Sequence, residues 1–176
     1  MTLNRNARMG LIALSVLALD QLTKVAVLKS LPRQEEIIVI DGFFKIVNWA
    51  NNGAAWSLFQ NQNALLAIVA LLALLGLFLW RHNFETATKL GQVSLGLIFG
   101  GILGNLIDRL RLEHVVDFLR FYLYRRGGDE VGFPAFNVAD SAICIGVGLL
   151  FILSWKSEEQ RGAVKEQGSD STVARQ

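Results

Sequence analysis

Four long stretches of hydrophobic residues dominate the pattern along the chain. The clearest covers residues 64–80, where seventeen consecutive apolar positions approach the ~20 residues that a helix needs to cross a ~30 Å hydrocarbon layer. Three further stretches, at about residues 9–28, 90–107 and 138–155, reach a similar length with a few polar interruptions. The pattern predicts a mainly α-helical integral membrane protein with four transmembrane helices. An even number of spans places both termini on one side.

The first stretch has some features of a secretory signal, because Arg5 and Arg8 precede an apolar run. The run is interrupted late by Asp20 and Lys24, and no small-x-small cleavage site follows it. We therefore expect it to be retained as a span. The short arm before it carries two arginines and no acid, whereas acids match the basic residues of the long loops. Because positive residues favour the cytoplasmic side, both termini are predicted to be cytoplasmic.

Two segments between the spans carry a different pattern. Residues 37–40 and 43–49 have the composition of β-strands and are joined by Asp41-Gly42, a dipeptide that favours a tight hairpin turn. They predict a small extracytoplasmic β-sheet. The segment from Asp108 to Pro134 has a glycine-rich polar middle and is expected to be mobile.

The chain divides into one membrane-embedded domain and a tail. Residues 1–155 hold all four spans, whereas residues 156–176 are polar, lack aromatic residues and are balanced in charge. A segment of that composition cannot bury enough apolar surface to fold alone. Residues 156–176 are therefore predicted to form a disordered cytoplasmic tail.

The amino-acid composition and net charge exclude several classes of function. The chain is 52% hydrophobic and 18% charged, with a mean hydropathy of +0.39, whereas globular domains carry about 25% charged residues. A net charge of +2 gives no basic footprint for nucleic acid. One cysteine and two histidines are too few for the usual thiolate or imidazole metal sites, so no metal is expected.

Ionisable residues inside predicted spans are costly in lipid, and each needs a partner or a function. Asp20 and Lys24 lie one helical turn apart, where opposite charges form an ion pair. We favour this structural interpretation over a direct role. Asp108, at the end of the third span, also needs a partner, and Arg109 or Lys24 would serve. The same span has small residues on one face, which lets another helix approach closely. They are Gly96, Gly100 and Gly104.

Two carboxylates are the best candidates for chemistry. Asp140 follows Asn137 by three residues at the start of the fourth span, a spacing close to a capping box, and alone it favours a structural role. Asp117 stands between two valines and a phenylalanine, where a carboxylate is poorly solvated. Brought to one site, the two could not both ionise easily, which leaves a neutral acid beside an ionised base. Aspartic proteases use such a pair to activate water.

Other interpretations of the polar residues are weaker. Cys144 lies one turn beyond Asp140 in an apolar helix and is expected to be a core residue. Ser141 and His114 could form a catalytic triad only with a third residue. Almost any sequence with two histidines and several serines permits such a set, so the pattern is weak evidence for a nucleophile. A proton transporter or a non-catalytic scaffold are the rival classes. The transporter is disfavoured because the carboxylates cluster near one predicted membrane face.

Five short motifs follow one another between residues 20 and 141. They are Asp20-Gln21-Leu22-Thr23-Lys24, Asn51-Asn52-Gly53-Ala54-Ala55-Trp56-Ser57, Gly104-Asn105-Leu106-Ile107-Asp108-Arg109, Val116-Asp117-Phe118 and Phe136-Asn137-Val138-Ala139-Asp140-Ser141. In this order, with four spans, they resemble the motifs of lipoprotein signal peptidase, or signal peptidase II. The resemblance covers nearly all of residues 9–155.

The resemblance implies a bacterial inner-membrane aspartyl endopeptidase, multi-pass, with its active site near the periplasmic face. Such an enzyme cleaves the signal peptide from a prolipoprotein on the N-terminal side of a cysteine that carries diacylglyceryl. The implied partners are this prolipoprotein and membrane lipid, without nucleic acid and without a cofactor. We expect a monomer.

The resemblance also implies roles for single residues. Asp117 and Asp140 match the catalytic pair, and the sheet and the segment after the third span match a substrate cradle and a mobile lid. The residues implied to bind substrate or support the site are Asn51, Gly53, Asn105, Arg109 and Asn137. Those implied to give structural support are Asp20, Lys24 and Asp108.

Overall fold

The structure is a computed structural model that describes residues 4–53, 58–84 and 88–173, with side chains described up to residue 157. Residues 54–57, the second half of the second sequence motif, lie outside the described residues.

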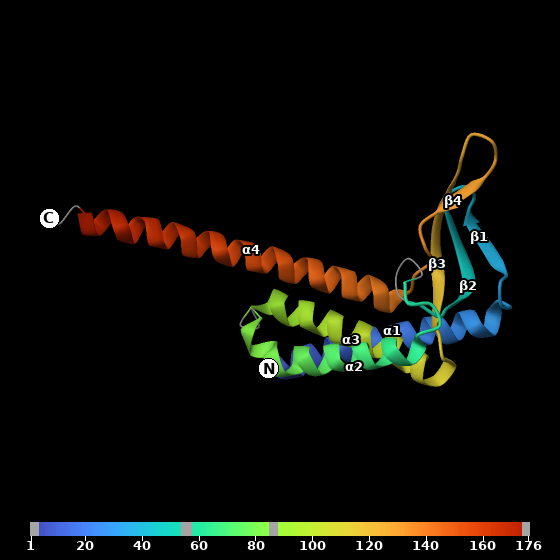
Figure 1. Cartoon of the computed structure of the whole chain (residues 1–176), viewed down its shortest axis with the longest axis horizontal. Coiled ribbons are helices and arrows are strands. Elements are labelled where there is room, and N and C mark those ends of the chain that lie inside the picture. Colours follow the sequence, from blue (N-terminus) through green and yellow to red (C-terminus); the bar gives the residue numbers. More distant parts are fainter. Residues whose placement is uncertain (1–3, 54–57, 85–87, 174–176) are drawn as a thin grey trace.

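Four helices form the main body. They are α1 (Arg5–Ser30), α2 (Asn63–Trp80), α3 (Lys89–Leu112) and α4 (Val138–Val173), and a short 3₁₀ turn (Arg81–Asn83) follows α2. Figure 1 shows α1, α2 and α3 running side by side, whereas α4 leaves them at an angle. Within the described residues, each of the four helices is long and apolar enough to cross a membrane. The prediction of four spans is therefore confirmed.

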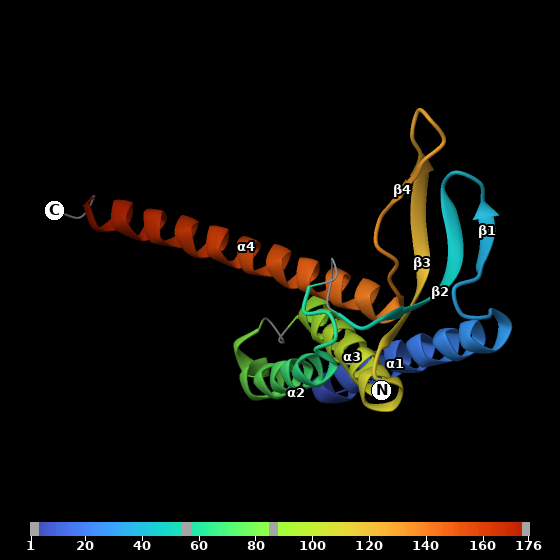
Figure 2. The same ribbon diagram turned by 45° about the vertical axis from the view of Figure 1, so that its right-hand side comes forward.

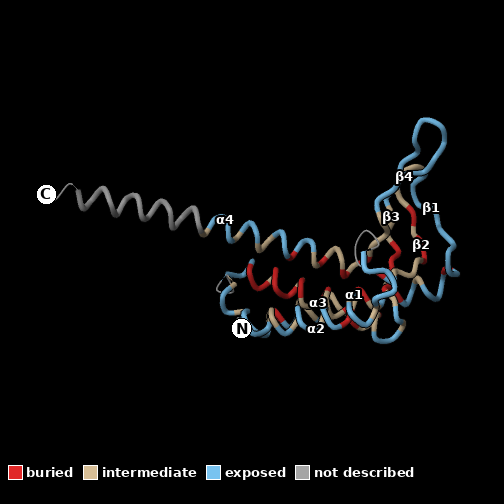
Figure 3. The backbone as a smooth tube through the Cα atoms, viewed as in Figure 1, coloured by how far each residue is buried: buried red, intermediate tan, exposed pale blue. Residues whose placement is uncertain are grey.

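Helix α3 is the centre of the bundle. In its spanning part 56% of the residues are buried, against 17% in α1 and in α4, whereas α2 buries only Ala67, and Figure 3 shows buried positions along α3. The predicted glycine face of α3 lies against α1. A Cβ at Gly100 would lie 2.6 Å from the main-chain oxygen of Ala13, and one at Gly104 would lie 2.5 Å from Oδ2 of Asp20. Larger residues there would separate the helices.

Helix α4 differs from the prediction, because its backbone continues as a helix to Val173, through most of the segment predicted to be disordered. The physical reason is that the apolar span already supplies the helical nucleus. Each further residue then adds a hydrogen bond without the cost of nucleation. The segment also contains several strong helix formers, among them Glu, Gln, Lys and Ala.

A four-stranded antiparallel sheet stands across one end of the helices (Figure 2). Its strands are β1 (Glu36–Ile40), β2 (Phe44–Asn51), β3 (Val115–Tyr124) and β4 (Glu130–Gly132), in that spatial order. The sequence predicted the β1–β2 hairpin and missed β3 and β4. The first four residues of β3 are all buried, so this strand lacks the alternation of polar and apolar residues that reveals a half-exposed strand. The mobility expected for this segment stays a prediction.

Candidate active site

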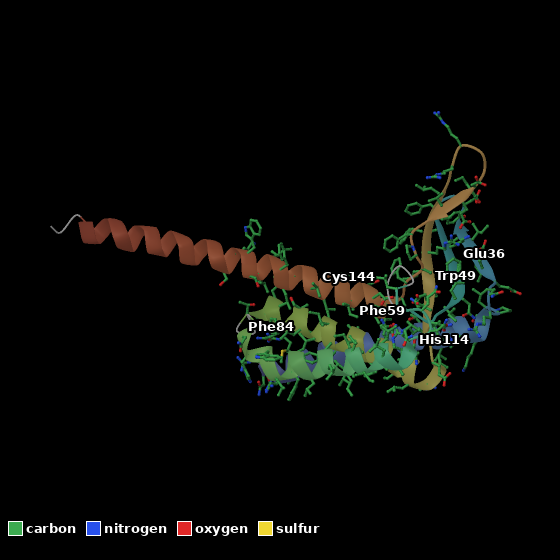
Figure 4. The ribbon with its side chains drawn as sticks, in the orientation of Figure 1. Glu36, Trp49, Phe59, Phe84, His114 and Cys144 are labelled. Atoms are coloured by element: carbon green, nitrogen blue, oxygen red, sulfur yellow. The ribbon has the colours of Figure 1, made fainter. Side chains whose placement is uncertain are left out.

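A cavity of about 670 Å³ lies where the sheet meets α3 and the first turns of α4. Figure 4 labels Trp49 and Cys144, which line it from the sheet and from α4. Of the seven residues implied to be catalytic or to bind substrate, six also line it, whereas Asn137 is fully buried behind its wall. The six are Asn51, Gly53, Asn105, Arg109, Asp117 and Asp140.

Asn137 joins the two candidate carboxylates. Its Nδ2 donates to Oδ1 of Asp117 at 2.8 Å, which ties α4 to β3. Its main-chain N–H donates to Oδ2 of Asp140 at 3.2 Å, and its Oδ1 accepts from the main-chain N–H of Asp140 at 2.9 Å. The predicted capping box is therefore present. The residue that caps α4 is also the one that holds Asp117 beside it.

Two further asparagines complete the hydrogen bonds to the carboxylates. Asn51, at the end of β2, donates from Nδ2 to Oδ2 of Asp117 at 2.9 Å, and its Oδ1 accepts from the N–H of Gly53 at 2.9 Å. Asn105, on α3, donates from Nδ2 to Oδ1 of Asp140 at 2.7 Å. All four carboxylate oxygens thus accept a hydrogen bond from an N–H group. Such contacts fix the positions of both side chains.

Asp117 lies in an environment that favours its neutral form. Its side chain is 3% exposed. Burial, and then the negative charge of Asp140, raise its pKa from 3.8 to about 7, against the opposing effect of the hydrogen bonds from Asn51 and Asn137 and the charge of Lys24. Desolvation disfavours a charged carboxylate, and a second carboxylate nearby adds repulsion. Near neutral pH Asp117 can therefore carry a proton.

A buried ionic cluster supports the site from α1 and α3. Nζ of Lys24 lies 2.9 Å from Oδ2 of Asp20 and 2.9 Å from Oδ2 of Asp108. The predicted pairing of Asp20 with Lys24 is confirmed. Of the two partners considered for Asp108, the structure selects Lys24 rather than Arg109. Lys24 also donates to Oδ1 of Asn105 at 3.0 Å, which links this cluster to Asp140.

Arg109 faces the segment that follows β2. Its Nη2 donates to the main-chain oxygen of Gly53 at 2.8 Å, and its Nη1 donates to Oδ1 of Asn63 at 3.4 Å. A Cβ at Gly53 would lie 2.8 Å from the main-chain oxygen of Leu58, so a side chain would not fit there. Arg109 and Gly53 together hold the chain that forms one wall of the cavity.

Sequence reasoning missed two polar residues of this region. Gln21 donates from Nε2 to Oδ1 of Asp108 at 3.0 Å and to the main-chain oxygen of Gly104 at 3.2 Å. Asn63 donates from Nδ2 to the main-chain oxygen of Arg109 at 2.9 Å. Both residues could have been found from the sequence. Each has an amide side chain within an apolar stretch or at its border, and such a group needs a buried hydrogen-bond partner.

The two alternative nucleophiles, Ser141 and Cys144, make different contacts from the two carboxylates. The hydroxyl of Ser141 donates to the main-chain oxygen of Asn137 at 3.0 Å, within its own helix. Cys144 was predicted to be a core residue, and this prediction is wrong, because its side chain is exposed and lines the cavity. One turn beyond Asp140, Ile143 packs near Gly101 of α3, whereas Cys144 faces the cavity. Within the described ranges no group of three His, Cys, Asp or Glu residues could hold a metal ion.

Four apolar helices of membrane-spanning length, with a small sheet at one end, define the class as a multi-pass membrane protein. Residues 12–156 match the family model described as signal peptidase (SPase) II. The chain belongs to this family.

Curated relatives named lipoprotein signal peptidase agree with the family match. The protein of Anoxybacillus flavithermus is 36% identical over 162 residues, which cover 92% of this chain and 93% of the relative. That of Bacillus pumilus is 39% identical over 142 residues, or 81% of this chain and 88% of the relative.

Solved structures show the same fold. A bacterial membrane enzyme determined by the in meso method at 2.3 Å resolution superposes with a TM-score of 0.76 and is 33% identical, covering 85% of this chain and 88% of that one. A second such structure, at 1.9 Å resolution, gives a TM-score of 0.66 at 33% identity, covering 81% and 89% of the two chains.

Proposed function

We propose that this chain removes the signal peptide from prolipoproteins by an aspartyl mechanism that uses Asp117 and Asp140. Family membership makes the chain a membrane protease that acts on lipoprotein signal peptides. The single observation that carries the aspartyl mechanism is that Asn137 holds both carboxylates at one cavity through hydrogen bonds of 2.8 and 3.2 Å.

We assign the acid and the base of this pair from their surroundings. Asp140 lies in the first turn of α4, where the helix dipole favours a negative charge, and accepts hydrogen bonds from Asn105 and Asn137. Asp117 lies on β3, not within a helix, and its pKa is raised to about 7. Asp140 is accordingly the ionised base and Asp117 the neutral acid, although the pair titrates as a unit.

The reaction then proceeds without a covalent intermediate. Asp140 takes a proton from water as the water oxygen attacks the scissile carbonyl carbon, while Asp117 gives its proton to the carbonyl oxygen. The C–N bond of the tetrahedral intermediate breaks as the leaving nitrogen receives a proton from Asp140. Asp117 regains the proton of the hydroxyl group as the carboxyl product forms. One water is consumed, and both carboxyls return to their starting states.

The cavity suits a substrate that arrives from the bilayer. Phe133 and Phe136 line it beside the two carboxylates, so an apolar chain and a peptide bond can bind next to each other. We propose that the substrate is the diacylglyceryl-modified prolipoprotein, cut on the N-terminal side of its lipidated cysteine. The sheet cradles it, and the β3–β4 hairpin moves as a lid to admit a lipidated helix sideways and then exclude water.

We also propose on which side of the membrane the cavity lies. The arm with Arg5 and Arg8 favours cytoplasmic termini, which places the sheet and the cavity at the opposite, periplasmic face of the inner membrane. Water is available at that boundary, as hydrolysis requires. We propose that one chain is sufficient for activity, because each of the two carboxylates already has its asparagine partners within the chain.

Cleavage of a matched pair of synthetic peptides by the detergent-purified protein tests this function. Both peptides contain the signal sequence and the cysteine, and only one carries diacylglyceryl. We expect cleavage of the lipidated peptide before the cysteine, by the wild type and by a His82→Gln control in the exposed turn that follows α2. Equal cleavage of the unlipidated peptide would contradict the proposed substrate, and cleavage at another bond would contradict the proposed site.

A further inference from the structure

The ammonium group of Lys24 has all three of its N–H directions occupied by groups on two helices. Nζ lies 2.9 Å from Asp20 on α1, 2.9 Å from Asp108 on α3 and 3.0 Å from Oδ1 of Asn105 on α3. The Lys24 side chain is 2% exposed and does not line the cavity. Lys24 therefore does not act by touching the substrate.

Lys24 decides which way the Asn105 amide points. An ammonium has three donors and no acceptor, so the side of Asn105 that faces it must be the carbonyl oxygen. The amide nitrogen is then turned to Asp140, to which it donates at 2.7 Å. The reverse orientation would place two donors together at one end and two acceptors together at the other. Lys24 thereby makes Asn105 a donor to Asp140.

The two carboxylates bound to Lys24 reach the backbone next to each member of the pair. Oδ1 of Asp20 accepts the N–H of Ala139 at 2.9 Å, one residue before Asp140. Oδ2 of Asp108 accepts the N–H of Val116 at 3.2 Å, one residue before Asp117. One ammonium thus connects α1 to the first turn of α4 and to the start of β3. These are the two elements whose relative position sets the separation of the carboxyl groups.

We propose that Lys24 is a positioning residue for the carboxylate pair, which orients Asn105 toward Asp140 and fixes, through Asp20 and Asp108, the separation of the two carboxyl groups. The inference deepens the proposed function and rests on it. It goes beyond an ion pair that only locks helices together, because it predicts a defect in the chemical step at unchanged substrate binding.

The chain contains a matched control for this proposal. Lys45 on β2 is also 2% exposed and also binds two carboxylates, Glu36 at 2.8 Å and Glu130 at 2.7 Å. Its contacts join β1, β2 and β4, and Glu130 also binds Arg120 in the second half of β3 at 2.8 Å. The backbone N–H groups next to Asp117 and Asp140 are bound instead by the carboxylates of the Lys24 cluster. Loss of Lys24 leaves two buried carboxylates without their cation, which lowers stability. Glu36 and Glu130 are 43% and 28% exposed, and Glu130 keeps its pair with Arg120, so loss of Lys45 costs less stability. Only the loss of Lys24 reaches the carboxylate pair.

Steady-state cleavage of the lipidated peptide by Lys24→Met and Lys45→Met variants, together with thermal unfolding in the same detergent, separates the two roles. For Lys24→Met we expect kcat to fall by about 100-fold, the usual cost of a misplacement of about 1 Å, with KM within about threefold of wild type. For Lys45→Met we expect a smaller loss of thermal stability. Because Lys45 binds Glu130 of the proposed lid, its loss can change KM, but kcat should stay within about threefold of wild type. Equal kcat values for the two folded variants would overturn the proposal.

A second comparison applies if Lys24→Met does not fold. Asp108→Asn is compared with the double variant Lys24→Met/Asp108→Asn, in which one fewer carboxylate lacks its cation. We expect kcat of the double variant to be at least about tenfold lower at the same KM, and equal values would overturn the proposal. An Asp117→Asn sample measured alongside distinguishes a failure of the proposed mechanism from a failure of the proposed role of Lys24. If it is active, the proposed mechanism fails, whereas if it is inactive and Lys24→Met is fully active, only the role of Lys24 fails.

Discussion

Asn137 holds Asp117 at 2.8 Å while its own main chain and Oδ1 form the N-terminal cap of α4 with Asp140. The residue that caps α4 therefore also joins α4 to β3, through a different atom of the same side chain. The residue has 0% exposure, so both roles are exercised from behind the wall of the cavity. The two roles can be separated by substitution.

Asn137→Ser retains a side-chain oxygen that can cap α4, but its shorter side chain does not reach Asp117. We expect stability close to that of the wild type and at least about a 100-fold loss of cleavage. Asn137→Ala removes both roles and should also lower the free energy of unfolding by about 1–2 kcal/mol. Thermal unfolding and cleavage of the lipidated peptide measure the two effects. Normal activity of folded Asn137→Ser would exclude the positioning of Asp117 by this amide.

Cleavage should depend on pH as expected for a pair that shares one proton. Because the pKa of Asp117 is raised to about 7, kcat/KM should fall as the pH rises through about 7, where the acid loses its proton. It should fall again at low pH, when Asp140 becomes protonated and no base remains. A bell-shaped profile is the expected result of a measurement from about pH 4 to about pH 9. Constant activity up to the alkaline end would contradict the assigned acid.

The same raised pKa affects stability. The unfolded chain releases the Asp117 proton near pH 3.8 and the folded chain near pH 7, so folding loses stability as the pH rises between these values. Asp117→Asn has no such proton. The stability of the variant relative to the wild type should therefore increase between about pH 4 and about pH 8, by at most about 4 kcal/mol. Unfolding measured at both pH values tests this difference, and a constant difference would contradict the raised pKa.

Arg109 should not be replaceable by lysine. Its two terminal nitrogens reach Gly53 and Asn63, at 2.8 and 3.4 Å, whereas a lysine has a single nitrogen without the planar fork. We expect Arg109→Lys and Arg109→Gln to lower kcat/KM by a similar factor, on the order of tenfold or more. Kinetic constants for both variants provide the measurement. Full activity of Arg109→Lys would show that charge alone is required.

Local spacing in the sequence was enough to predict several parts of the site. The one-turn separation of Asp20 and Lys24 and the three-residue separation of Asn137 and Asp140 both produced the predicted contacts. These pairs lie on single helices or at a helix terminus, where geometry follows from chain periodicity alone.

Contacts between distant elements were not predictable in this way. That Asn51 reaches Asp117 depends on the register of β2 with β3, which includes an irregularity between Ile46 and Trp49. Strand β3 was not predicted because both of its faces are buried at its start, so its sequence does not alternate between polar and apolar residues. The exposure of Cys144 depends on a cavity that only the tertiary structure forms.

The central claim is that Asp117 and Asp140 together hydrolyse the peptide bond, and single-turnover cleavage by Asp117→Asn and Asp140→Asn tests it most directly. Excess enzyme is mixed with the lipidated peptide, and product is followed by mass spectrometry after proper folding and peptide binding are verified. We predict that each variant binds the peptide and loses at least about 10³-fold in rate. Cleavage by either folded variant at the rate of the wild type would contradict the account.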